Sequence, residues 1–201
     1  IATELTGLGT LIVAAAGNDG QSFFATGSPA TYPEVLSVAA TVDNDLLRLS
    51  VTAPAAAVAD YPAAEAMFTQ QLVAAGALGA QLVVASPALG CTPFTNAVSV
   101  AGKIVLVDRG TCPFVNKLTN AAAAGAIAAV VVDDEDMALP FPMGGADPGS
   151  VPIPGVMVRL SDGAALKAAL SQGAVTIGLD AAKRYDGPGA ELLAGLSSRG
   201  P

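Results

Sequence analysis

The segment 102–132 constrains the fold more than any other part of the chain. It opens with the apolar run Ile104–Val107, whose length and composition are typical of a buried strand. Pro113 suits the first turn of a helix, and apolar residues then recur at helical spacing as far as Gly125. A second apolar run, Ile127–Val132, follows directly. This strand, helix, strand order predicts a parallel pair of strands joined by a right-handed crossover.

Further elements are expected on both sides of this unit. Prolines at positions 54 and 62 argue against a long helix in the segment 51–68 and favour edge strands and turns there. Ser161 is expected to cap a helix that runs to about Leu170. Three more strands are predicted, over residues 81–85, 153–158 and 174–179. The middle of the chain is therefore predicted to be a mixed α/β, or α+β, domain.

Composition supports a globular fold and excludes some classes of partner. Apolar residues make up 52% of the chain and aromatic residues 4%, so the core is built mainly from small aliphatic side chains. A formal net charge of −8 repels phosphate backbones and anionic lipid surfaces. The longest apolar run, residues 121–132, falls well short of the roughly 20 residues that span a bilayer. We expect neither nucleic acid nor membrane as a partner.

The absence of histidine restricts the chemistry of the chain. With no histidine, a Ser-His-Asp site and the zinc sites made of histidine and carboxylate cannot be assembled from these residues. The acidic run Asp133–Asp136 offers oxygen ligands for calcium, but it lacks the glycine and the spacing of an EF-hand loop. A solvated turn at a strand end is the favoured interpretation of this run. We therefore expect no metal and no cofactor.

Cys91 and Cys112 are the two cysteines, and their spacing matches no metal motif. A disulfide is the favoured interpretation, with two unrelated buried thiols as the alternative. Such a bridge would contribute about 3 kcal/mol by restricting the unfolded chain. Because disulfides persist in oxidising compartments, we expect a secreted parent protein.

The N-terminal part of the chain carries two apolar runs, Thr10–Ala16 and Val35–Thr41, bounded by Gly, Pro and Asn. Such runs are typical of buried strands in a parallel sheet. Asn18 follows the first run within the sequence Gly-Asn-Asp-Gly. Taken alone, that sequence is most simply a turn, because asparagine tolerates left-handed backbone.

Three segments resemble the core of the subtilisin-like serine proteases, the subtilases. They are "IVAAAGNDG", "SPATYPEVLSVAAT" and "LSSRGP", and they occur here in the family's order. By this resemblance Asn18 matches the asparagine of the oxyanion hole, whose side-chain amide donates a hydrogen bond to the tetrahedral intermediate. The family's catalytic Asp and His precede this asparagine and its nucleophile follows the last segment, and none of the three is found in this chain. Ser197 and Ser198 match structural positions, so the chain is expected to be inactive alone.

The middle of the chain resembles the protease-associated (PA) domain. The resemblance is carried by "GKIVLVDRGTC", within residues 89–134, and by residues 143–170. It implies a non-catalytic module that controls substrate access, binds peptides or proteins, or holds a protease together, and it supports the pairing of Cys91 with Cys112. The implied fold is a PA-type β-barrel or sandwich with flanking helices, plus partial strands of a subtilisin-like α/β sheet. The expected domains are a PA domain over 46–182 inserted between catalytic-domain segments 1–45 and 183–201.

Four residues of the middle zone are candidates for binding. Met137, Phe141 and Met143 lie in a Gly/Pro-rich loop and form either an exposed apolar contact surface or a loop folded over the core. Arg109 either recognises a carboxylate or forms a structural ion pair at a strand end.

The predicted function follows from the two resemblances. We expect the non-catalytic PA region of a secreted subtilase, with protein or peptide substrates and the rest of the parent protease as partners. The alternative is an independent PA-type binding module from a receptor, a ligase or an aminopeptidase.

Overall fold

The structure is a computed structural model that describes residues 2–20, 24–41, 46–137, 139–185 and 197–198. The chain divides into two compact units. One comprises residues 1–44 and 188–201 and is called the flanking unit below. The other comprises residues 45–187 and is called the barrel unit.

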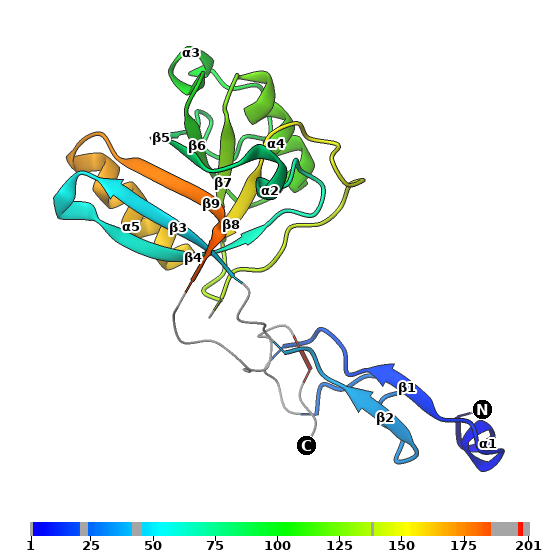
Figure 1. Ribbon diagram of the computed structural model, residues 1–201. Coiled ribbons are helices and arrows are strands. Elements are labelled where there is room, and N and C mark those ends of the chain that lie inside the picture. The colour runs from blue at the N-terminus through cyan, green and yellow to red at the C-terminus, as the bar shows by residue number, and fades with distance from the viewer. Residues whose placement is uncertain (1, 21–23, 42–45, 138, 186–196, 199–201) are drawn as a thin grey trace. The chain divides into compact units, whose positions relative to one another are not determined.

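Seven strands of the barrel unit close into a barrel in the order β3-β4-β8-β7-β6-β5-β9 (Figure 1). Strands β5 to β8 pair in parallel, and the remaining pairs are antiparallel. The predicted mixed α+β fold with a PA-type barrel is confirmed. The strands are β3 (Leu47–Ala53), β4 (Ala59–Glu65), β5 (Leu78–Val84), β6 (Ile104–Asp108), β7 (Ala128–Val132), β8 (Gly155–Val158) and β9 (Thr176–Arg184).

Short helices connect these strands. The bounds are η1 (Ala55–Ala57), α2 (Leu72–Ala75), α3 (Ala97–Val100), α4 (Phe114–Ala123) and α5 (Leu160–Gln172). As predicted, α4 begins directly after Pro113 and links the parallel strands β6 and β7. The predicted cap at Ser161 is wrong, because α5 begins at Leu160, two residues earlier than such a cap implies, and its N-cap is Arg159. The guanidinium of Arg159 instead pairs with Asp162 in the first turn, at 2.7 and 2.8 Å.

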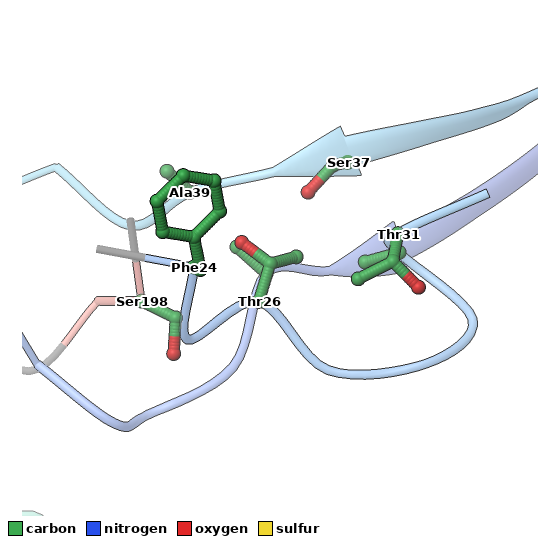
Figure 2. A pocket seen from close by; sticks show the side chains of 8 residues that line it. Phe24, Thr26, Thr31, Ser37, Ala39 and Ser198 are labelled. Carbon is green, nitrogen blue, oxygen red and sulfur yellow. The ribbon is translucent and has the colours of Figure 1, made fainter. Parts of the chain in front are cut away.

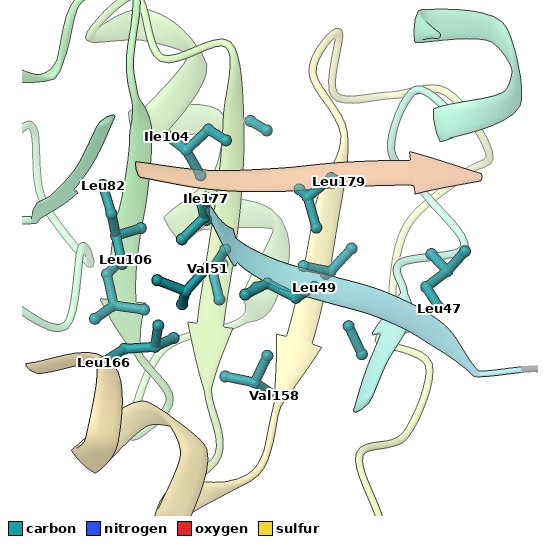
Figure 3. Close-up of a cluster of buried hydrophobic side chains, with 14 of the residues drawn as sticks. Leu47, Leu49, Val51, Leu82, Ile104, Leu106, Val158, Leu166, Ile177 and Leu179 are labelled. Carbon is teal, nitrogen blue, oxygen red and sulfur yellow. The ribbon is translucent and has the colours of Figure 1, made fainter. Parts of the chain in front are cut away.

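Buried side chains form two clusters on opposite faces of the parallel strands. Along β6, Ile104 and Leu106 belong to the cluster inside the barrel, whereas Val105 and Val107 belong to an outer cluster with Leu118 of α4. Figure 3 shows the inner cluster, into which Leu166 of α5 projects near Leu106. Burial on both faces explains why these strands are continuous apolar runs.

The flanking unit contains α1 (Ala2–Gly7), β1 (Ile12–Ala15) and β2 (Val35–Val38). The two strands pair in parallel, from Ile12 opposite Val35 to Ala15 opposite Val38, as predicted. Their predicted burial is wrong for most side chains: Leu11, Val13, Leu36 and Val38 are 74, 56, 53 and 47% exposed. Within the described residues of this unit, these four side chains are left open to solvent.

No helix in the described part of the chain has the length and apolar character needed to cross a membrane.

Candidate functional site

The carboxyl ends of β1 and β2 are held together by two serines from far along the chain. The main-chain N–H of Ala40 donates to Ser197 Oγ at 3.0 Å, across 157 positions. The N–H of Asp19 donates to Ser198 Oγ at 2.9 Å, across 179 positions, and the N–H of Ser198 donates to the Gly17 carbonyl at 3.0 Å. Both serines are buried, at 2 and 3% exposure. Their hydroxyls are structural acceptors, as the sequence led us to expect.

Asn18 lies between the two residues that Ser198 binds. Gly17 has a φ of +112°, and a Cβ at this position would lie 2.7 Å from Ser198 Oγ, so only glycine fits. Asn18 itself is exposed at the end of β1. Because the backbone on each side is fixed, the Asn18 amide is presented to solvent from a held turn. Such a donor can stabilise a developing negative charge with little reorganisation.

A hollow of about 440 Å³ adjoins this turn within the flanking unit. Figure 2 shows the ring of Phe24 and the hydroxyls of Thr26 and Ser37 around it. Its position at the carboxyl ends of parallel strands is where ligands bind in open α/β sheets. Among the described residues, the lining carries no ionisable side chain. These lining residues are Ala16, Phe24, Thr26, Ala30, Thr31, Ser37, Ala39 and Ser198.

In the barrel unit, Arg109 forms an ion pair at the ends of β6 and β7. Its Nη1 lies 2.6 Å from Asp133 Oδ1 and 3.1 Å from Asp134 Oδ1. The Asp133 side chain is fully buried and also accepts the N–H of Asp134 at 2.8 Å. Arg109 thus has the geometry of the structural ion pair, which the sequence left open as an alternative. Asp133 is buried against Arg109, whereas residues 134–136 are exposed, so only the later part of this run is solvated. The described residues include no acidic, Cys or His cluster arranged to hold a metal.

The loop that carries Met137, Phe141 and Met143 folds over the core. Met143 is completely buried in the outer cluster, and its carbonyl accepts the N–H of Met67 at 2.9 Å. Phe141 packs edge-on against Phe114, with ring centroids 6.4 Å apart, and lies 5.3 Å from the Arg109 guanidinium. Met143 therefore does not belong to an exposed contact surface. Of the two alternatives, the loop folded over the core is the one observed, with Phe141 packed against Phe114 of α4. Met137 is half-buried.

Cys91 and Cys112 form the predicted disulfide, with their Cα atoms 5.7 Å apart. Sequence reasoning missed Lys117, which is fully buried in α4 beside this bridge. Its Nζ donates to the Leu89 carbonyl at 2.6 Å. The signal was present in the sequence, because Lys117 lies at helical spacing between the apolar Phe114 and Ala121.

Comparison with protein-family models decides the class of the barrel unit, because residues 68–166 match the PA domain. This chain contains a PA domain. The match begins at the buried Phe68 and ends at Leu166, so it spans the parallel half of the barrel, the whole of α4 and the first half of α5.

The chain spans less than half the length of each of the three similar proteins described next. The Minor extracellular protease Vpr of Bacillus subtilis is 30% identical over 199 residues, which cover 96% of this chain and 22% of that protein. The solved structure of BSAP, a zinc aminopeptidase from Bacillus subtilis, is 27% identical with a TM-score of 0.50, over 70% of this chain and 31% of that one. The psychrophilic subtilisin-like protease Apa1 from the Antarctic psychrotroph Pseudoalteromonas sp. AS-11 has a TM-score of 0.54 at 20% identity, over 89% of this chain and 49% of that one. The chain is thus similar in sequence to an extracellular protease and a zinc aminopeptidase, and similar in fold to a subtilisin-like protease.

Proposed function

We propose that this chain is the PA-domain region of a secreted subtilisin-like serine endopeptidase. In this proposal residues 46–182 form a non-catalytic PA domain inserted into the catalytic domain. Residues 1–45 and 183–201 are segments of that catalytic domain on either side of the insertion. The PA domain controls the access of protein substrates or binds proteins and peptides.

The observation that carries the proposal is the pair of serine hydrogen bonds in the flanking unit. Ser197 and Ser198 follow the barrel in sequence, yet they bind Ala40 and Asp19, which precede it. A barrel whose preceding and following segments belong to one compact unit has the organisation of an inserted domain. The similarity to an extracellular protease along 96% of the chain supports the same organisation.

The exposed strands of the flanking unit support its membership of a larger sheet. Parallel sheets are normally covered on both faces by helices. Here the side chains of Val13, Leu36 and Val38 are each about half exposed within the described residues. The proposed catalytic domain would supply the missing layers and neighbouring strands.

In the proposed parent enzyme, Asn18 donates its side-chain amide to the oxyanion of the tetrahedral intermediate. The held turn around Asn18 suits this role, and the hollow lined by Ala16 and Ser198 adjoins the same turn and can take part of a substrate. Without histidine, this chain lacks the usual general base, so the nucleophile and its base must come from elsewhere in the parent.

A direct experiment removes the PA domain from the full-length gene product. Residues 46–182 are deleted and the strand ends are joined by a short turn. We expect hydrolysis of a short chromogenic peptide to persist while the cleavage of a large folded protein changes. Unchanged cleavage of both substrates would contradict a role in substrate access.

The likeness to a zinc aminopeptidase over 70% of the chain favours one alternative, a PA-type binding module in an aminopeptidase. The alternative assigns no catalytic role to Asn18. The class of inhibitor distinguishes the two proposals. A serine-directed phosphonate should inhibit the full-length protein if it is a serine endopeptidase, and a zinc chelator should inhibit it if it is a zinc aminopeptidase.

A further inference from the structure

Lys117 is a buried cation that contacts a disulfide. Its side chain is fully buried, with Nζ 2.6 Å from the Leu89 carbonyl oxygen and 3.9 Å from Cys91 Sγ. Asn120, one helical turn later, donates to the Gly90 carbonyl at 2.9 Å. Helix α4 therefore holds the loop that carries Cys91 through two side chains in addition to the disulfide.

Within the described residues, no carboxylate lies at ion-pair distance from Lys117. The nearby acidic groups are bound to other cations: Asp108 to Lys167, and Asp133 and Asp134 to Arg109. Burial lowers the pKa of Lys117, and the more distant charges of Asp108 and Asp134 oppose that change. A buried ammonium with no adjacent anion is costly, and a new negative charge beside it would be stabilised.

Cys91 Sγ is the contacting group that can acquire such a charge. We propose that the Cys91–Cys112 disulfide is a site of thiol exchange with small thiols, in which Lys117 stabilises Cys91 as the leaving thiolate. An external thiolate attacks Cys112 Sγ, and a new sulfur–sulfur bond forms between them. The Cys91–Cys112 bond breaks, and its electron pair leaves on Cys91 Sγ beside the Lys117 ammonium. The product is a mixed disulfide at Cys112 and a thiolate at Cys91.

The geometry favours both the reaction and its reversal. Both cysteines are half-buried, so a small thiol reaches the bridge without global unfolding. A thiol whose thiolate is stabilised by a neighbouring cation leaves faster in exchange. After the exchange, the bonds from Lys117 to Leu89 and from Asn120 to Gly90 keep Cys91 next to Cys112. The free Cys91 thiolate can then attack the mixed disulfide and expel the external thiol.

The first test locates the adduct on the unaltered chain. The oxidised protein is incubated with one equivalent of reduced glutathione near pH 7, quenched with N-ethylmaleimide, and mapped by peptide mass spectrometry. We expect glutathione on Cys112 and maleimide on Cys91. Because Cys112 precedes α4, its thiolate would gain from the amide groups at the helix start. Glutathione mainly on Cys91 would mean that the start of α4 stabilises the Cys112 thiolate more than Lys117 stabilises the Cys91 thiolate. That result would overturn the proposal.

The second test removes the charge. Lys117→Gln keeps a donor in the side chain but no charge, and Lys117→Met keeps only the length. Exchange is expected to slow on the order of tenfold in both variants, whereas Lys103→Gln, away from the bridge, leaves the rate unchanged. Far-ultraviolet circular dichroism and thermal unfolding of the oxidised variants establish that each is folded. Exchange at the unaltered rate in folded Lys117→Gln would overturn the proposal, and if neither variant folds, the mapping of the unaltered chain decides.

Discussion

The hydroxyl of Ser198 accepts the main-chain N–H of Asp19 at 2.9 Å, although 179 positions separate the two residues. The bond fixes the turn that presents Asn18, and it connects the segment after the barrel to the segment before it. Ser198→Ala removes the acceptor of this partly buried hydrogen bond.

We expect Ser198→Ala to cost about 0.5 to 1.5 kcal/mol of the stability of the flanking unit, the net worth of an ordinary hydrogen bond. Amide hydrogen exchange at Asp19 measures this locally, since protection should fall while exchange in β6 is unaffected. Ser99→Ala, on an exposed position of α3, serves as the matched control. Equal protection at Asp19 in both variants would show that the bond does not hold the turn.

The Arg109–Asp133 pair should matter far more than a surface pair. Arg109→Ala leaves the fully buried Asp133 carboxylate without its cation. We expect a loss of about 2 to 3 kcal/mol, somewhat below the range for a wholly buried pair because the Arg109 side chain is 26% exposed. The control is Arg48→Ala, whose partner Asp60 is 47% exposed at 3.5 Å and which should cost less than about 1 kcal/mol. Urea unfolding measures the loss of stability in both variants. Equal losses would contradict a larger contribution from the Arg109–Asp133 pair.

Gly163 allows α5 to lie close to β7. A Cβ at this position would collide with the Val132 side chain, which is itself packed in the inner cluster. Gly163→Ala should therefore destabilise the barrel by about 1 to 3 kcal/mol, despite the better helix propensity of alanine. Gly79→Ala, where the nearest atom lies 4.0 Å away, is the control and should shift the urea midpoint little. A stabilised Gly163→Ala variant would show that α5 moves freely away from Val132.

Glu65 gives the fold a pH dependence of a defined sign. Burial raises its pKa, against the lowering effects of the Leu72 N–H that it accepts at 2.5 Å and of the charge on Arg184. A raised pKa in the folded state means that the native protein holds the Glu65 proton more tightly than the unfolded chain does. The stability that Glu65 contributes is therefore fully present below about pH 4.5 and is lost as the pH rises through the pKa of the folded state.

Glu65→Gln keeps an acceptor for Leu72 but does not ionise. Its stability relative to the unaltered chain should therefore improve between pH 4 and pH 7, as measured by urea unfolding at both values. The exposed Glu34→Gln is the control. A relative stability of Glu65→Gln that is flat, or that falls over this range, would contradict the assigned direction.

The parallel half of the barrel could be predicted from the sequence, because strands buried on both faces leave continuous apolar runs. Ile104–Val107 and Ile127–Val132 are such runs, and each matches its observed strand within one residue. The strand ends in the antiparallel half are harder to predict from the sequence. β9 continues to Arg184, beyond the predicted end at residue 179, because its pairing with β3 extends the strand past its apolar part.

The candidate site could be predicted only in part, because some of its features depend on local residue types and others on contacts between distant segments. The disulfide and the turn at Asn18 follow from residue types in short segments. The burial of Met143 and Lys117 depends on contacts with segments distant in sequence, which local composition does not reveal. A lysine that projects into an apolar helix face is a usable signal, but nothing in the sequence says that its amine meets Leu89 and Cys91.

In the proposed parent enzyme, Asn18 belongs to the oxyanion hole of a serine endopeptidase. We would test this role by measuring kcat for Asn18→Ala in the full-length gene product with a short chromogenic peptide. We expect kcat to fall by about 10² to 10³, the loss established for removal of such a donor in a subtilisin, with KM little changed. Asn116→Ala, an exposed position on α4, should leave kcat unaltered. An unchanged kcat in Asn18→Ala, or full activity in the presence of a serine-directed phosphonate, would contradict this role.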